Sequence, residues 1–248
     1  MLSAKEIAGK WEGIAKTKAS LGVLSCVLLG ILAGMYIAFG ALGCTIVQNA
    51  VGGGMGKFLG ACVFPAGLIL VVMAGGELFT GNCLMAGPAA KKAIGWGGLL
   101  RNWGLVYLGN MAGALLLALI AYYGGFFNQA ELAKAAGSIA VNKCALSFGQ
   151  AFLRGVGCNV LVCGAVWMAS GAENAAGKAV CCFFPVMLFV LCGFEHSVAN
   201  MYYIPLGMLT QCGVSAGDYV LHNLLPVTLG NITGGGGLAL IYAAVYRK

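Results

Sequence analysis

Six predominantly apolar stretches of the chain are long enough to cross a lipid bilayer, and no other feature constrains the fold as strongly. A transmembrane helix needs about 20 apolar residues. The stretches are 21–43, 58–87, 103–124, 145–170, 180–210 and 220–245. Only 8% of the residues are charged, whereas a soluble domain carries about 25%. We therefore predict an all-α integral membrane protein with six transmembrane helices.

The lysine and arginine residues predict how these helices are oriented, because such residues concentrate in cytoplasmic loops. If the amino terminus is cytoplasmic, ten basic residues lie inside and three outside. The ten are Lys5, Lys10, Lys16, Lys18, Lys91, Lys92, Arg101, Lys178, Arg247 and Lys248. The three are Lys57, Lys134 and Lys143, while Arg154 falls within the fourth span. We predict that both termini are cytoplasmic and that residues 1–20 form an amphipathic helix there. The net charge of +7 reflects this topology rather than nucleic-acid binding.

The second and fifth spans are too long for one straight crossing, and they share a pattern of residues. Each has Phe-Pro near its start, followed by an apolar run and a glycine. A glutamate comes next, Glu77 or Glu195, with an asparagine five residues later, Asn82 or Asn200. We predict that both helices are broken at this point.

The third and sixth spans also match, because each contains an LGN triplet that ends at Asn110 or Asn231. The chain is thus predicted to be a single domain, 1–248, built from repeats at 21–124 and 145–246. Three crossings are an odd number, so the second repeat is inverted. Inverted repeats with interrupted helices are typical of channels and transporters, with the site at the breaks. Irregular backbone at membrane depth lies against protein or a water-filled cavity, so we expect a pore there.

His196 is the candidate for the central pore residue, because it lies beside the second break in the stretch FEHSVAN. Ionisable groups at membrane depth are costly and usually functional. The alternative is a buried histidine that only supports the break. Thr80, after the first break, has a hydroxyl that can face the pore or bond back to its own helix. We expect Glu77 and Glu195 to be structural, accepting backbone N–H groups at the broken helix ends.

Four apolar side chains flank the breaks at helical spacing, and we expect them to form constrictions that oppose leakage. They are Phe64, Leu68, Phe79 and Phe189. Ordinary core packing is the alternative. Lys143 ends a short predicted extracellular loop, where it would attract anions to the outer mouth or be a plain surface lysine.

The sequence contains no pattern typical of a metal site, a cofactor site or an enzyme. Its eleven cysteines form no C-x-x-C pair or zinc-like spacing. A membrane enzyme could use Glu77, Glu195 and His196 as acid and base, but no nucleophile motif or cofactor loop accompanies them. A neutral-solute channel of aquaporin or ammonia type remains the alternative to an anion channel. Against it, neither break carries Asn-Pro-Ala, and paired pore histidines are absent.

Four segments together resemble the formate/nitrite transporter family, and most closely its hydrosulfide channel branch. They are GGELFTGN, NVLVCGAVW, GFEHSVANMYYIP and LLPVTLGNITGG. The resemblance implies an aquaporin-like homopentamer in the cytoplasmic membrane of a prokaryote. It implies one pore per subunit that passes small anions, most of all hydrosulfide, and also formate and nitrite. It assigns pore or anion-binding roles to His196, Thr80, Lys143, Asn231, Asn82 and Asn200, and the constrictions to the four apolar residues above.

These expectations combine into a mechanism. An anion that enters a narrow apolar slit loses hydration, which costs several kcal/mol. His196 could offset this loss by supplying positive potential or by handing a proton to the anion. Either role predicts that anion flux depends on pH within the titration range of histidine. The sequence leaves both roles open.

Overall fold

The structure, a computed structural model, describes residues 1–246, which contain helices and turns but no strand. Arg247 and Lys248, two of the basic residues used to predict orientation, lie outside the described residues. Six helical segments in the described part are long and apolar enough to span a membrane. They are Val23–Val51, Gly53–Gly75, Trp96–Tyr123, Phe148–Gly171, Ala175–Cys192 and Ala216–Val245. The predicted all-α fold with six apolar helices is confirmed.

The first half of the chain runs from an amino-terminal helix to the third span. Its elements are α1 (Ala4–Ser20), α2 (Val23–Val51), α3 (Gly53–Val63), α4 (Ala66–Leu70), the π-helical η1 (Val71–Gly75), α5 (Phe79–Asn82), the 3-10 turn η2 (Cys83–Met85), α6 (Ala86–Ala90) and α7 (Trp96–Tyr123). The second half has the same order of spans, divided into fewer helical segments. Its elements are α8 (Ala130–Cys144), α9 (Phe148–Gly171), α10 (Ala175–Cys192), α11 (Ser197–Leu209), α12 (Ala216–Asp218), the π-helical η3 (Tyr219–Leu224) and α13 (Leu225–Val245).

Both predicted helix breaks are present. The backbone leaves helical geometry at 76–78, between η1 and α5, and at 193–196, between α10 and α11. Gly75 has a φ of 86° and Gly193 a φ of 73°, a region that glycine enters without the steric cost that other residues meet. A glycine two residues before each glutamate therefore lets the chain turn out of one helix and start the next.

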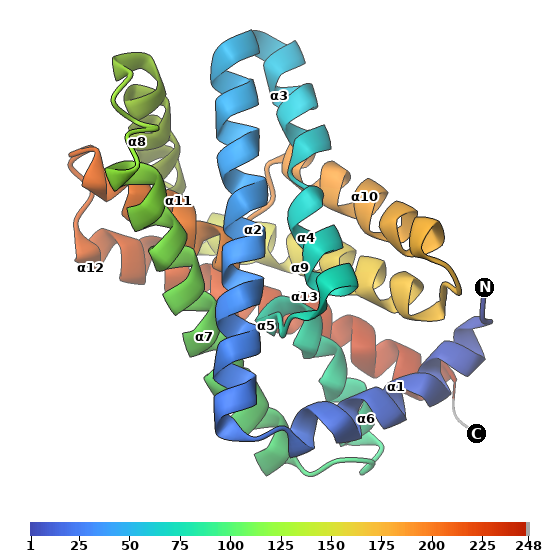
Figure 1. The fold of residues 1–248 in the computed structure, drawn as a ribbon. Helices are drawn as coiled ribbons and strands as arrows, with labels where there is room; N and C mark the ends of the chain where they lie inside the picture. Colours follow the sequence, from blue (N-terminus) through green and yellow to red (C-terminus); the bar gives the residue numbers. More distant parts are fainter. Residues whose placement is uncertain (247–248) are drawn as a thin grey trace.

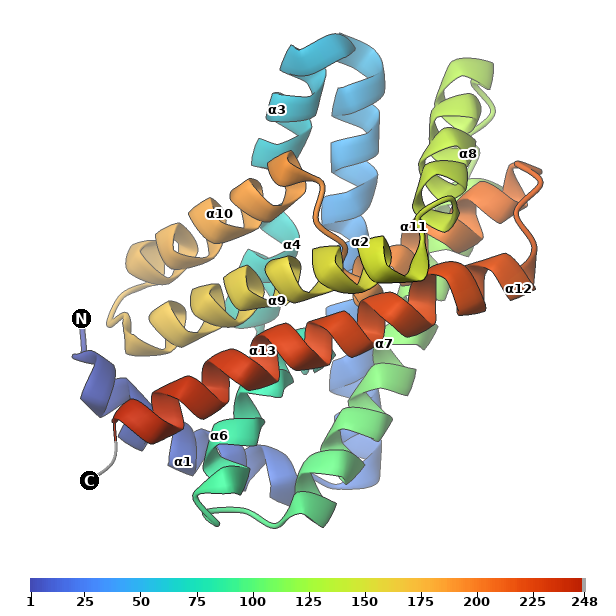
Figure 2. The ribbon, with the colours of Figure 1, turned by 180° about the vertical axis from the view of Figure 1, so that it is seen from behind.

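Each repeat pairs its first and last spans closely, α2 with α7 and α9 with α13. Figure 2 shows α9 and α13 running alongside each other over most of their length. A Cβ atom on Gly113 would overlap the carbonyl oxygen of Ile31, and one on Gly234 would overlap that of Val156. Glycine at these positions lets the backbones touch, as is common in membrane helix pairs.

The helix α1 crosses one end of the bundle, next to α6 (Figure 1). A capping box begins it, in which Ser3 and Glu6 bond each other's backbone N–H groups. Its buried face presents Ile7, Trp11 and Ala15 to the core. The Met1 ammonium donates to Glu173 at 2.8 Å, and this bond holds the pKa of the Glu173 carboxyl below its ordinary value.

The segment before the fourth span is a helix, and the prediction of a short loop ending at Lys143 was wrong. The 15-residue α8 packs against α11. Leu132, Ala136 and Ala140 recur every four residues on its buried face, which is the helical period. The segment is rich in alanine and too short to span a membrane, so its periodicity was easy to miss.

Candidate pore site

Two cavities lie on opposite sides of the helix breaks. The α1-side cavity, next to the first break, has a volume of about 320 Å³. Lys10, Trp11, Lys18, Leu68, Leu78, Asn82 and Lys178 are among its lining residues. The α8-side cavity, next to the second break, measures about 140 Å³. Phe64, Lys143, Phe189, Glu195, His196, Asn200 and Tyr203 are among its lining residues.

The two breaks are joined by a hydrogen bond between His196 and Thr80, both buried. The His196 Nε2 and Thr80 Oγ1 atoms are 2.8 Å apart. The Ala199 backbone N–H donates to His196 Nδ1 at 3.0 Å, so Nδ1 carries a lone pair and no proton. The ring is then the neutral tautomer with its proton on Nε2, which donates to the Thr80 hydroxyl. The hydrogen of that hydroxyl remains available to another acceptor.

Glu195 accepts from side chains of three different elements. The Lys143 ammonium on α8 lies 2.9 Å and 3.1 Å from its two carboxylate oxygens. The Asn200 amide donates to it at 2.7 Å and the Asn223 amide at 3.3 Å. The Glu195 side chain is 6% exposed. The predicted pore lysine Lys143 is thus also the partner of a buried carboxylate.

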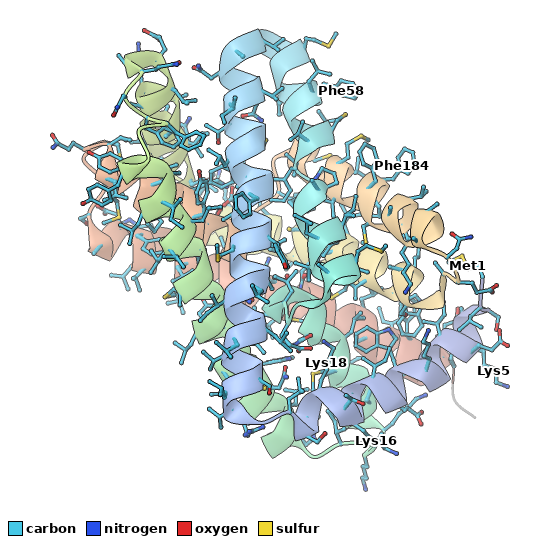
Figure 3. All side chains as sticks on the ribbon, viewed as in Figure 1. Met1, Lys5, Lys16, Lys18, Phe58 and Phe184 are labelled. Carbon is cyan, nitrogen blue, oxygen red and sulfur yellow. The ribbon has the colours of Figure 1, made fainter. Side chains whose placement is uncertain are left out.

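Glu77 has the same arrangement at the first break. The Lys18 ammonium, at the end of α1, donates to one carboxylate oxygen at 2.6 Å. The Asn82 amide donates to the other at 2.7 Å and also to Asn102 at 2.8 Å. Figure 3 shows Lys18 pointing into the fold, whereas Lys16 on the same helix points away from it.

An asparagine, and not the glutamate, accepts the first backbone N–H group of the new helix at each break. Asn110 Oδ1 accepts from the Phe79 N–H and Asn231 Oδ1 from the Ser197 N–H, each at 2.9 Å. The Asn231 amide also donates to the Glu195 carbonyl at 3.0 Å. The prediction that Glu77 and Glu195 accept these N–H groups was wrong, because lysine and asparagine side chains occupy their carboxylates. Their structural role at the breaks stays a prediction.

Lys18, the partner of Glu77, is the residue at the breaks that the sequence analysis missed. Lys18 and Lys143 each lie five residues before the long helix that follows, which starts at Val23 or Phe148. That matched spacing was the available signal. The pore roles predicted for Asn82, Asn200 and Asn231 stay predictions. In this conformation their amide groups bond the protein itself.

The structure separates the four residues predicted to form constrictions. The Phe64 and Phe189 rings meet edge to face with centroids 5.6 Å apart, and Phe189 stacks on His196 at 5.8 Å. Leu68 lines the other cavity. Phe79 is not among the residues lining either cavity, and its ring packs on Tyr107 with centroids 4.8 Å apart. Leu78, which the sequence did not single out, lines the α1-side cavity instead.

Taken together, the six apolar helices, the paired breaks and the two cavities define a membrane transport protein built from two inverted repeats. A family profile described as "Formate/nitrite transporter" matches residues 5–245. The chain belongs to the formate/nitrite transporter family, whose members are channels and transporters rather than enzymes.

Individual relatives are similar over almost the whole chain. The "Probable formate transporter" of Methanothermobacter thermautotrophicus is 40% identical, over 94% of this chain and 92% of its own length. The solved structure titled "Pentameric formate channel with formate bound" is 36% identical with a TM-score of 0.81, covering 91% of this chain and 98% of its own. A second, titled "FNT family ion channel", is 29% identical with a TM-score of 0.86, covering 96% and 97%.

Proposed function

We propose that this protein is a channel for small monovalent anions of weak acids, with formate, nitrite and hydrosulfide as candidate substrates. The observation that carries the proposal is the His196–Thr80 hydrogen bond, which joins the two helix breaks between two cavities. Formate is supported by the names of the similar proteins. The hydrosulfide preference implied by the motifs has no such support and is proposed as one of the three.

The arrangement suits an anion that must leave water. On one side of His196, the Phe64 and Phe189 rings narrow the path with apolar surface, where a bare charge is costly. At the breaks, the Thr80 hydroxyl and the His196 Nε2–H supply donors to a dehydrated anion. The hydroxyl can donate its own hydrogen while it accepts from His196.

The same geometry bears on whether His196 gives up a proton. A neutral imidazole donates a hydrogen bond but does not transfer its only N–H proton to a weak acid's anion. Proton transfer would first require a second proton on Nδ1, which would end the bond from the Ala199 N–H. We therefore propose that the resting His196 acts as a neutral donor. A proton relay would need this local rearrangement.

Flux through purified protein tests the proposal. We expect protein in liposomes to pass formate, nitrite and hydrosulfide without any added cofactor, and to pass chloride far more slowly. Chloride is the control because, unlike the other three ions, it is not the anion of a weak acid. Influx of each ion is followed by the volume or internal pH of the vesicles. Equal rates for liposomes with and without the protein would contradict the proposal.

We also propose that both termini face the cytoplasm of a prokaryotic cell. This orientation places the ten basic residues inside against three outside, in accord with the excess of basic residues in cytoplasmic loops. It puts the α1-side cavity on the cytoplasmic side. A reporter fused after Lys248 that is active only on the outside would contradict the orientation.

A homopentamer is the proposed assembly, by similarity to the pentameric formate channel. Arg154 marks a contact between subunits in this proposal. It is exposed on α9, and no carboxylate among residues 1–246 pairs with it. Its carbonyl oxygen accepts from the Glu195 N–H at 3.2 Å, whereas in the first repeat the carbonyl of Leu29 accepts from Glu77. A cation that replaces leucine in this position is costly against lipid.

Replacing Arg154 with leucine is expected to lower the fraction of pentamer in detergent, while Arg154→Lys retains most of it. The reason is that lysine keeps a charged donor for the neighbouring subunit. Light scattering with the detergent contribution subtracted measures the mass of each variant. A pentamer equally stable in Arg154→Leu would remove Arg154 from the contact, and a monomeric native protein would contradict the pentamer itself.

A further inference from the structure

The two cavities differ in charge, although the repeats that build them are alike. Three lysines, Lys10, Lys18 and Lys178, are among the lining residues of the α1-side cavity, and no aspartate or glutamate is. The α8-side cavity is lined by Lys143 and by the carboxylate of Glu195. The difference follows from residues outside the two matching ion pairs, Lys18–Glu77 and Lys143–Glu195.

In these two ion pairs, a glutamate carboxylate neutralises the lysine on each side. Lys18 lies 2.6 Å from Glu77, and Lys143 lies 2.9 Å from Glu195. Lys10 and Lys178 remain on the α1 side. The Lys10 ammonium donates to the Ser170 carbonyl oxygen at 2.7 Å, a neutral acceptor that leaves its charge uncompensated. No ion pair joins Lys178 to a carboxylate within residues 1–246.

The equivalent elements on the other side do not supply such charges. Lys134 on α8 and Lys57 on α3 are basic residues of the matching helices, but neither is among the residues that line the α8-side cavity. The two repeats therefore have matching ion pairs, but only the α1-side cavity is lined by lysines that no carboxylate neutralises within residues 1–246. Two additional lysines line one cavity only.

We propose that the α1-side cavity is an anion-collecting site, in which Lys10 and Lys178 hold a small monovalent anion before it reaches the His196–Thr80 pair. The inference rests on the proposed function and adds a binding step to one side of the path. With about 320 Å³, the cavity accommodates such an ion with part of its hydration water. The site raises the local anion concentration, so it accelerates passage from the α1 side at low anion concentration without changing the equilibrium.

The size of the effect depends on ionic strength. Two unit charges several ångströms from an anion in water raise its local concentration by roughly five-fold at low salt. The Debye length is about 30 Å at 0.01 M salt and about 3 Å at 1 M. The advantage of the α1 side is therefore expected at low ionic strength and lost at high ionic strength.

A double variant, Lys10→Gln with Lys178→Gln, tests the site. The matched control is Lys5→Gln with Lys16→Gln, which removes the same charge from α1 at positions that point away from the fold (Figure 3). Formate flux is measured from each side separately in phosphatidylcholine vesicles, at low and at high ionic strength. A cleavable amino-terminal tag reports the orientation through its accessibility to external protease. A repeat with an anionic phospholipid shows whether lipid phosphate competes for the two lysines.

We expect the double variant to raise the half-saturating formate concentration about five-fold from the α1 side at low salt, and to leave the α8 side unchanged. The control pair should behave as the native protein does. Equal half-saturation in the double variant and the native protein would overturn the site, as would a matching change in the control. An effect present only with anionic phospholipid would assign the lysines to lipid phosphate and also overturn it.

Formate binding is measured separately from flux, as the broadening of the ¹³C-formate NMR resonance by the protein in neutral detergent. The native protein should broaden the resonance at lower formate concentration than the double variant. If formate does not cross the native channel yet this difference persists, the proposed function fails and the collecting site stands. If formate crosses the channel and the difference is absent, the site fails and the proposed function stands.

Discussion

Replacing His196 with asparagine is expected to leave the fold intact and to lower formate flux by roughly ten-fold or more. His196 is the N-cap of α11, where its Nδ1 accepts the Ala199 N–H. Asparagine is a favoured N-cap residue, so its side-chain oxygen can take over that bond. Its amide is too short to replace the Nε2–H that reaches Thr80. Losing a donor to a charged group costs about 1.5–3 kcal/mol, which corresponds to the expected loss of flux.

The pH dependence distinguishes a functional His196 from one that only supports the break. We expect native formate flux to respond to pH only where the His196 ring takes up a second proton, and the His196→Asn profile to show no such response. The reason is that a second proton on the ring would break the Ala199 bond and rearrange the second break. Liposome flux of formate, which stays ionised between about pH 5 and 8, is measured over that range for both proteins. Overlapping profiles and equal rates, with intact assembly, would leave His196 as a support of the break.

Thr80 provides the matched control for this experiment. Thr80→Val removes the hydroxyl and keeps the shape of the side chain, so it should reduce flux as His196→Asn does. Thr80→Ser keeps the hydroxyl and should retain most of the flux. A strong loss in Thr80→Ser would indicate that the packing of the methyl group, and not the hydrogen bond, is what matters at this position.

Replacing Glu195 with glutamine is expected to destabilise the protein by about 3–5 kcal/mol. The change leaves the Lys143 ammonium, whose side chain is only 17% exposed, without its carboxylate. Breaking a buried ion pair is costly because the remaining charge is uncompensated. The equivalent change, Glu77→Gln, should act in the same direction through Lys18. Thermal unfolding followed by size-exclusion chromatography measures the loss.

The double variant Glu195→Gln with Lys143→Met distinguishes this explanation from simple loss of packing. It also removes the Lys143 ammonium that Glu195→Gln leaves unpaired, so the double variant should be more stable than Glu195→Gln alone. Asn200 and Asn223 can still donate to the glutamine oxygen. A double variant less stable than the single one would show that Lys143 contributes by its own packing, including its position 5.3 Å from the Tyr203 ring centroid.

The sequence by itself determined the membrane class, the six spans and the positions of both breaks. These depend on local properties: the length of apolar runs, glycine before each glutamate, and the order of short motifs that recur along the chain. Each can be recognised without knowing what lies next to it in space. The same local signals identified the polar residues at the breaks, which are His196, Thr80, Glu77 and Glu195.

Only the tertiary structure decided how those residues are paired. Lys18 and Glu77 are 59 positions apart, and Lys143 and Glu195 are 52 apart, so no local pattern assigns one to the other. The structure likewise shows that Asn110 and Asn231 accept the first backbone N–H group of each new helix, and it places Phe79 against Tyr107 rather than in a cavity lining. A buried donor or charge bonds whichever acceptor the packing of distant helices brings within reach, and this depends on the whole fold.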